Sequence, residues 1–227
     1  MITLRNVSHF RPGTRRKVPI VLDASLHCAA RDRIGILAVP GSGKSSLARL
    51  FCGIDQPDVG QVKIEGRIGW PLGFAGFLHP ELTVGQNIAI VSKICGFAPS
   101  HAQDFVCDFT EISNVLPRRT EDLSPSERAL VAYGISLAIP SNYVIADEVI
   151  TLGARHMREK CEALLEERLR SAGLILIARS ARRLRRHCDT FHLLIGHRLK
   201  PCPDIEAGER ALEMQQTNAS ETELEHV

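Results

Sequence analysis

The sequence around Lys44 brings together residue types that bind phosphate. A strand-like run, Arg33 to Ala38, enters a Pro-Gly-Ser-Gly turn at residues 40–43, and Lys44 and Ser45 open a helix-like segment. Backbone N–H groups of such a turn converge on an anion, and the N-terminus of the following helix adds positive potential. The lysine reaches the β- and γ-phosphates of a nucleotide, and the serine hydroxyl ligates Mg²⁺. The stretch therefore predicts a nucleotide-phosphate site; the alternative is a glycine-rich loop that arose by chance.

One position departs from the usual G-x-x-x-x-G-K-S/T pattern, because Ala38 stands where the first glycine is expected. A methyl group there is expected to strain the turn without removing a phosphate donor. Gly41 and Gly43 still allow the backbone to approach a ligand closely. The loop residues predicted to bind nucleotide are Ala38, Val39, Pro40, Gly41, Ser42, Gly43, Lys44, Ser45 and Ser46.

Two adjacent carboxylates form a second candidate site. Asp147 and Glu148 follow the apolar run at residues 143–146. In a fold built on a phosphate loop, such a strand lies beside the strand that feeds the loop, so we expect Asp147 to hold Mg²⁺ and Glu148 to polarise water near the γ-phosphate. The alternative is that both acids only end the strand and cap the next element.

The elements around these residues predict an α/β fold with a largely parallel sheet. Short strand-like pieces at Ile2–Val7, Ile20–Leu26 and Gln61–Ile64 indicate an antiparallel flap before the parallel core. From Leu82 to Ile139 the apolar spacing is helical, with Thr83 as a start signal, which predicts an inserted helical subdomain over about residues 82–140. Gly96 is the expected end of its first helix.

Strand signals return after this helical segment. The runs at Asn142–Ile150 and Gly173–Ala178 are apolar, and TFHLLIG at residues 190–196 is a last strand. Between the first two lies a predicted helix with one apolar face made by Met157, Cys161, Leu164 and Leu165. We expect residues 1–203 to form one domain, followed over 204–227 by a short polar helix and a disordered tail that starts at Thr217.

Composition narrows the possible partners. The chain has 227 residues, with 28 basic and 26 acidic side chains and a net charge of +2, so no overall field favours nucleic acid. The basic run ARRLRRHC at residues 181–188 is most simply a solvated helix face. Seven scattered cysteines without C-x-x-C spacing indicate reduced thiols. No apolar run reaches the roughly 18 residues that span a membrane, so a partner is expected to carry any spans.

Several longer phrases resemble one protein family. The loop, the strand carboxylates and the helical segment between them are similar to the ATP-binding subunit of an ABC transporter. Within that superfamily the closest phrases resemble the branch that exports capsular and related cell-surface polysaccharides: GSGKSSLARLFCGIDQPDVGQVKIEGRIGWPLGF, HPELTVGQNI and LAIPSNYVIADEV. The similarity extends from about Met1 to Lys200.

The resemblance implies how such a chain works. It implies a homodimer that sandwiches two ATP molecules with Mg²⁺ and drives a membrane-spanning ABC permease from the cytoplasmic side of the inner membrane. An aromatic side chain near Phe10 or Arg11 is expected to stack on adenine; Phe10 offers the better ring, whereas gapless matching favours Arg11. The catalytic residues it implies are Glu148, Lys44 and Arg179, the last in place of a switch histidine. A heterodimer with an active homologue is the alternative assembly.

The family signature, which contacts ATP bound to the partner chain, is the first of several departures. It corresponds here to Ser124, Pro125, Ser126 and Glu127. Ser124 still offers a hydroxyl, but Pro125 lacks an N–H, Ser126 replaces a glycine, and Glu127 brings a negative charge. Equally, Ser-Pro-Ser-Glu is a good helix start with a capping box. A working contact in trans and a merely well-capped helix therefore both fit this stretch.

Other departures affect the switch and the coupling loop. Arg179 is a fixed cation that cannot orient water through a neutral ring nitrogen, and Ala154 takes the place of the aspartate beyond the catalytic glutamate. Gln86 comes too late to sense Mg²⁺, which leaves His79 as the nearest polar candidate. These departures support an alternative function, a nucleotide-gated subunit that hydrolyses ATP poorly. A soluble ATPase of DNA maintenance or translation is a weaker alternative, since such proteins carry extra domains.

Overall fold

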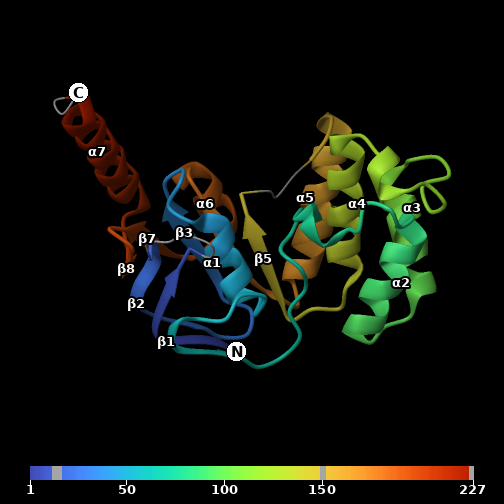
Figure 1. The fold of residues 1–227 in the computed structure, drawn as a ribbon, viewed down its shortest axis with the longest axis horizontal. Coiled ribbons are helices and arrows are strands. Elements are labelled where there is room, and N and C mark those ends of the chain that lie inside the picture. The colour runs from blue at the N-terminus through green and yellow to red at the C-terminus, as the bar shows by residue number, and fades with distance from the viewer. Residues whose placement is uncertain (12–16, 149–151, 225–227) are drawn as a thin grey trace. The chain divides into compact units, whose positions relative to one another are not determined.

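The computed structural model describes residues 1–11, 17–148 and 152–224, drawn as a ribbon in Figure 1. These residues form two compact units. Unit 1 comprises Met1–Glu65 together with the chain from Gly173 onward, and unit 2 comprises Gly66–Ala172. No helix within the described ranges is long and apolar enough to cross a membrane. The domain boundary expected at residue 203 stays a prediction.

Three antiparallel strands form the first sheet of unit 1, as the sequence predicts. β1 (Ile2–Phe10) lies between β2 (Pro19–Cys28) and β4 (Val59–Ile64). Both pairings shift register near the middle of β1. Gly60 lies beside this irregularity with a φ of +82°, and a Cβ there would come within 2.3 Å of the carbonyl oxygen of Asn6. Only glycine allows so close an approach of two backbones.

Four further strands of unit 1 lie side by side in the order β6-β3-β7-β8. β3 runs parallel to β6 and β7, and β8 returns antiparallel to β7. The register sets Leu37 opposite Ala178, so the residues that follow β3 and β6 meet at one edge of the sheet. β6 is buried throughout, which explains its unbroken apolar sequence. The strands are β3 (Arg33–Ala38), β6 (Gly173–Ala178), β7 (Thr190–Ile195) and β8 (Arg198–Pro201).

The helices of unit 1 are α1 (Lys44–Phe51), α6 (Ala181–His187) and α7 (Ile205–Leu224). On α6, Leu184 is buried and the four arginines are exposed, which agrees with a solvated face. The disordered tail expected from Thr217 is a wrong prediction as far as Leu224, because α7 continues through these residues. Ala219, Glu221, Glu223 and Leu224 of this stretch are good helix formers, so polarity alone does not indicate disorder.

Helices dominate unit 2, where the sequence predicts an inserted helical segment. Their apolar faces meet in a core that includes Ile88, Val106 and Ile135. Phe109 stacks on Tyr133, with 5.6 Å between the ring centroids. The elements are α2 (Val84–Cys95), α3 (Pro99–Thr110), α4 (Pro125–Ala138), α5 (Arg155–Leu169), the 3₁₀ turns η1 (Ala75–Phe77) and η2 (Thr120–Asp122), and strand β5 (Tyr143–Asp147).

Unit 2 extends beyond the segment expected at residues 82–140, because β5 and α5 pack with it. The N–H of Leu72 donates to the carbonyl of Ile145 at 2.7 Å, which joins β5 to the chain before the helices. α5 buries Met157 and Cys161 as predicted, while Leu164 is half-buried. The end of the strand expected as far as Ile150 lies outside the described residues.

The predicted ends of α2 are confirmed. Thr83 and Gln86 form a capping box, in which Thr83 Oγ1 accepts from the N–H of Gln86 and the Gln86 side chain accepts from the N–H of Thr83. Gly96 ends the helix in a left-handed conformation with a φ of +71°. The carbonyl oxygen of the Gln86 side chain is thus engaged at the start of its own helix.

Candidate functional site

The glycine turn in unit 1 has the backbone that a phosphate loop needs. Gly41 and Gly43 have φ angles of +79° and +91°, which favour glycine. At Gly43 a Cβ would also come within 2.8 Å of Ile20 Cγ2. The strain expected at Ala38 is a wrong prediction, because Ala38 is the last residue of β3, is buried, and pairs in register with Leu194. Its methyl group therefore lies in extended backbone before the turn begins.

The loop side chains turn back onto the loop itself. Ser42 Oγ donates to the carbonyl of Val39 at 2.8 Å, and Lys44 Nζ donates to the same oxygen at 3.1 Å. The ammonium group consequently lies over the loop, at the site where the sequence predicts phosphate.

The N-terminus of α1 suits an external anion. Its N-cap is Gly43, which supplies no capping side chain, and the first turn contains no acidic residue. The initial N–H groups of a helix need acceptors from outside the helix. A phosphate group would provide such acceptors and would also be stabilised by the helix dipole. The residues of the loop therefore fit a nucleotide phosphate.

The two residues predicted to stack on adenine have different surroundings. Arg11 donates from its guanidinium to the carbonyl of Gly41 at 3.3 Å, so it supports the loop. Phe10 is half-buried at the end of β1, and Lys17 Nζ lies 5.5 Å from the centroid of its ring. Phe10 therefore stays the predicted stacking surface.

Arg179 is the first residue after β6. Ala178, the residue before it, is opposite Leu37 in the parallel register, so Arg179 lies at the same sheet edge as the start of the phosphate loop. Its side chain is exposed. This placement suits a cation that contacts a phosphate, and the catalytic role of Arg179 stays a prediction.

The two adjacent carboxylates belong to unit 2. Asp147 is the last residue of β5, after the buried residues Val144, Ile145 and Ala146. Glu148 has a φ of +60°, a left-handed conformation that is uncommon for a residue with a side chain. Such backbone strain costs on the order of 1–3 kcal/mol and gathers at functional sites. Six other described residues with side chains share a positive φ, so the catalytic role of Glu148 stays a prediction.

The signature segment forms the capped helix that its sequence also predicts. Ser124 Oγ accepts from the N–H of Glu127 at 3.2 Å, and the Glu127 carboxylate accepts from the N–H of Ser124 at 2.8 Å. Pro125 occupies the first helical turn and Ser126 is exposed. Arg118 binds the same carboxylate at 2.6 Å. The N-terminus of α4 is thus satisfied by its own side chains.

The charge of Glu127 is strongly stabilised at this helix start. The hydrogen bond from Arg118 and the backbone N–H of Ser124 lower the pKa of Glu127 to about 2. The carboxylate consequently remains negative at any physiological pH. This fixed negative charge lies beside Ser124, the residue predicted to contact ATP bound to the partner chain.

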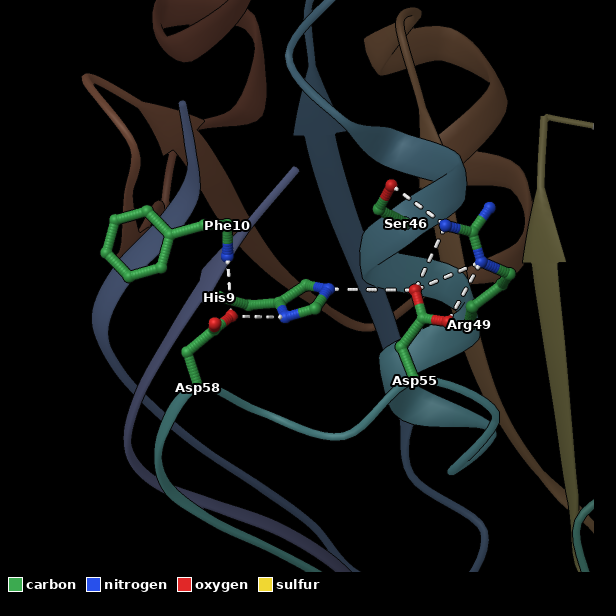
Figure 2. A network of polar contacts seen from close by, with 6 residues as sticks. All are labelled: His9, Phe10, Ser46, Arg49, Asp55 and Asp58. Atoms are coloured by element: carbon green, nitrogen blue, oxygen red, sulfur yellow. Dashed lines mark hydrogen bonds and ion pairs between the residues drawn. The ribbon is translucent and has the colours of Figure 1, made fainter. Parts of the chain in front are cut away.

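Sequence reasoning missed a group of polar residues beneath the phosphate loop. The sequence alone indicates no more than a structural role for His9, yet its ring lies between Asp55 and Asp58, and Arg49 binds Asp55 from α1 (Figure 2). The signal available in the sequence is the spacing of two acids three residues apart directly after the loop helix. We call His9, Arg49, Asp55 and Asp58 the His9 cluster.

Comparison with known proteins decides the family. Residues 21–151 match the family model described as ABC transporter, which is more than half of the chain. The chain belongs to the ABC transporter family. This ABC transporter chain is 31% identical over 195 residues to the "Capsule polysaccharide export ATP-binding protein CtrD" of Neisseria meningitidis serogroup B, covering 86% of this chain and 90% of the relative. It is also 30% identical over 158 residues to the "Polysialic acid transport ATP-binding protein KpsT" of Escherichia coli, covering 69% and 72%.

Solved structures support the fold of this ABC transporter chain. A dimeric post-hydrolysis state of the ATP-binding cassette MJ0796 bound to ADP and Pi has a TM-score of 0.73 at 18% identity, covering 88% of this chain and 96% of that one. A second dimeric structure of MJ0796 has the same TM-score at 19% identity. The predicted α/β, ABC-type phosphate-loop fold with an N-terminal antiparallel β subdomain is therefore confirmed.

Two further positions of this ABC transporter chain bear on the predicted departures. Ala154 is the N-cap of α5 and supplies no capping side chain, so the position predicted to lack the coupling aspartate also lacks a helix cap. His79 is exposed, and its backbone is held by buried Asn87, which accepts from the N–H of His79 at 2.8 Å and donates to its carbonyl at 3.1 Å. The backbone at residue 79 is thus fixed while its imidazole faces solvent.

Proposed function

We propose that this chain is the ATP-binding subunit of an ABC transporter that exports capsular or related cell-surface polysaccharide. The proposal is supported by the phosphate loop at the uncapped N-terminus of α1, with Lys44 over it, and by the identity to capsule and polysialic acid export proteins over most of their length. Since exported sugar contacts the membrane-spanning partner, the individual polysaccharide is set outside this chain.

Each site residue has a proposed role. The loop N–H groups and Lys44 bind the β- and γ-phosphates, while Phe10 stacks on the base. Ser45 and Asp147 are hard oxygen donors of the kind Mg²⁺ prefers. When bound, Mg²⁺ neutralises charge on the phosphate oxygens. Glu148 orients and polarises the attacking water, and Arg179 supplies a positive charge near the γ-phosphate.

We propose a homodimer that binds ATP between its two copies and docks on a membrane-spanning ABC permease at the cytoplasmic side of the inner membrane. Closure of the dimer on ATP and its opening after hydrolysis would convert nucleotide binding energy into a movement of the permease. Ser124, Pro125, Ser126 and Glu127 would then face the nucleotide of the partner copy. Nucleic acid has no part in this function.

A second candidate function is a nucleotide-gated subunit that hydrolyses ATP poorly, paired in a heterodimer with an active homologue. The observation that favours it is the closed capping box of α4, which places the negative charge of Glu127 beside Ser124. Arg179 in place of the switch histidine and Ala154 in place of the coupling aspartate also favour this candidate. The strained backbone of Glu148 argues for the first candidate, since a chain without hydrolysis has little use for a positioned carboxylate.

The first experiment is steady-state ATP hydrolysis by the purified chain, alone and reconstituted with its permease in liposomes. We expect turnover that is abolished in Glu148→Gln, a variant that still binds MgATP, and we expect Lys44→Ala to lose MgATP binding. Tight binding without turnover, with or without the permease, would instead support the nucleotide-gated subunit. Unchanged MgATP affinity in Lys44→Ala would disprove the phosphate-loop assignment.

The substrate class is tested in cells. Deletion of the gene should remove polysaccharide from the cell surface and leave the polymer inside, and the wild-type gene but not the Glu148→Gln variant should restore export. Surface polysaccharide that is unchanged by deletion would refute the export assignment without affecting ATP binding.

A further inference from the structure

The His9 cluster connects the end of β1 to the phosphate-binding helix. His9 is the second-last residue of β1 and only 6% exposed. Its Nδ1 lies 3.1 Å from an oxygen of Asp58, and its Nε2 lies 3.6 Å from an oxygen of Asp55. Figure 2 shows the imidazole between the two carboxylates, which approach it from opposite sides. The bond at Nδ1 and the burial of the ring leave little freedom for the backbone that carries His9, while Nε2 faces Asp55 beyond hydrogen-bond distance.

Asp58 holds the three residues at the end of β1. Its Oδ2 accepts from the N–H of Phe10 at 2.9 Å and faces His9, while its own N–H donates to the carbonyl of Ser8 at 3.0 Å. The N–H of Phe10 and the bond to His9 both lower the pKa of Asp58, so the carboxylate is charged at neutral pH. Bonds to a charged acceptor are the stronger kind. The position of Phe10 therefore depends directly on Asp58.

Asp55 holds the other end of the cluster. Arg49 of α1 donates from Nε to both oxygens of Asp55, at 3.0 and 3.2 Å, and its terminal nitrogen lies 3.0 Å from Asp55. The same guanidinium donates to Ser46 Oγ at 3.3 Å. Ser46 is the last predicted residue of the phosphate loop, and it lies one residue after the predicted Mg²⁺ ligand Ser45. The contacts thus lead from Phe10 to the loop, and their longest step is the 3.6 Å between His9 Nε2 and Asp55.

We propose that the His9 cluster positions Phe10 relative to the phosphate loop and so determines how much adenine contributes to ATP affinity. This inference rests on the proposed nucleotide-binding function. The base-stacking residue belongs to β1 and the phosphate donors belong to α1, and a nucleotide must contact both at a fixed separation. Together with the Arg11 guanidinium, which donates to the carbonyl of Gly41, the cluster sets this separation. His9, Asp55 and Asp58 are positioning residues, because they act through Phe10 and Ser46.

A purely structural histidine gives a different expectation. If His9 only fills the interior of unit 1, its replacement lowers stability and leaves the relative affinities for different ligands unchanged. If it positions Phe10, its replacement weakens binding of ligands that carry a base and spares ligands that consist of phosphate alone. The ratio of the affinity for a ligand with a base to the affinity for phosphate alone, measured on the same folded variant, distinguishes the two cases.

The test compares MgATP with magnesium tripolyphosphate by isothermal titration calorimetry on the full chain. Stacking of one base on an aromatic side chain corresponds to about a 5- to 140-fold gain in affinity. We expect His9→Gln and Asp58→Asn to lose at least 5-fold in MgATP affinity while tripolyphosphate affinity changes less than 2-fold. His27→Gln is the matched control, because His27 is an exposed histidine on neighbouring β2 whose ring lies 3.3 Å from the hydroxyl of Thr3, away from the cluster.

A double-mutant cycle shows whether the effect passes through Phe10. Phe10→Ala should lose the same base-dependent part of the MgATP affinity as His9→Gln. The double variant His9→Gln with Phe10→Ala should bind MgATP no more weakly than Phe10→Ala alone. Additive losses, or equal losses for the two ligands, would overturn the positioning role while leaving the phosphate loop intact. Absence of MgATP binding by the wild-type chain would overturn both this inference and the proposed function. Thermal unfolding of each variant confirms that the folded chain is compared.

Discussion

The capping box of α4 makes a quantitative prediction about Glu127. The variant Glu127→Gln keeps a side chain that can bond the N–H of Ser124, but it removes the negative charge from the helix N-terminus and from Arg118. A charge in the first turn contributes about 0.3–1 kcal/mol, and a partly exposed ion pair contributes about 0.2–1 kcal/mol. We therefore expect Glu127→Gln to lower the free energy of unfolding by about 1 kcal/mol at pH 7.

The sign of the pH dependence comes from the lowered pKa. Glu127 titrates at about 2 in the folded chain, below the value of 4.5 for an unperturbed glutamate, so its contribution is fully present above pH 4.5. The contribution is lost as pH falls from about 4.5 through about 2. Urea unfolding of wild type and Glu127→Gln should therefore differ at pH 7 and converge toward pH 3.

The control is Glu121→Gln, which removes a more exposed carboxylate paired with Arg119 at 3.4 Å. Its effect should be near zero at both pH values, because exposed ion pairs contribute little. If Glu127→Gln matched wild type at pH 7, or if the difference persisted unchanged at pH 3, the assigned stabilisation of this carboxylate would be incorrect.

Two further predictions concern the backbone around the site. Ala154→Asp should raise the free energy of unfolding by about 1 kcal/mol, because the N-cap of α5 has no capping side chain, and chemical denaturation that shows no gain would refute an uncapped start. Gly43→Ala should destabilise the chain more than Gly41→Ala, since both glycines have a positive φ but only Gly43 lies 2.8 Å from a side chain at its Cβ position. Equal unfolding midpoints for these two variants would contradict the packing at Ile20.

Most of the correct fold predictions came from short sequence patterns, such as apolar runs and capping boxes. β3 and β6 begin and end where their apolar runs do, and the helix starts at Thr83 and Ser124 arise from capping boxes that are complete within four residues. These features depend on neighbours in sequence, so the sequence alone determines them. The strain predicted at Ala38 is absent because Ala38 is the last residue of β3, in extended backbone, and does not belong to the turn.

The His9 cluster shows what local reasoning misses. His9 and Asp58 are separated by 49 residues in the chain, and no periodicity or spacing connects them. Their contact exists because β1 pairs with β4, and the turn before β4 then carries Asp58 back to the end of β1. The two acids three residues apart after α1 are a signal in the sequence, but by themselves they do not identify His9 as their partner.

The contrast between two helix starts bears most directly on whether this chain hydrolyses ATP. α1 begins at a glycine with no acidic residue in its first turn, whereas α4 begins with Ser124 engaged as its cap and Glu127 held beside it by Arg118. A phosphate at the N-terminus of α1 gains hydrogen bonds and a favourable dipole, but a phosphate at the N-terminus of α4 meets a carboxylate that stays ionised. Contact between Ser124 and the nucleotide of the partner chain thus requires Arg118 to offset both negative charges or the capping box to open.

Arg118→Ala should consequently weaken any ATP-dependent dimer far more than it weakens nucleotide binding by one chain. Analytical ultracentrifugation of the Glu148→Gln background with MgATP measures that difference. Equal dimerisation with and without Arg118 would mean that the signature segment takes no part in binding the partner's nucleotide.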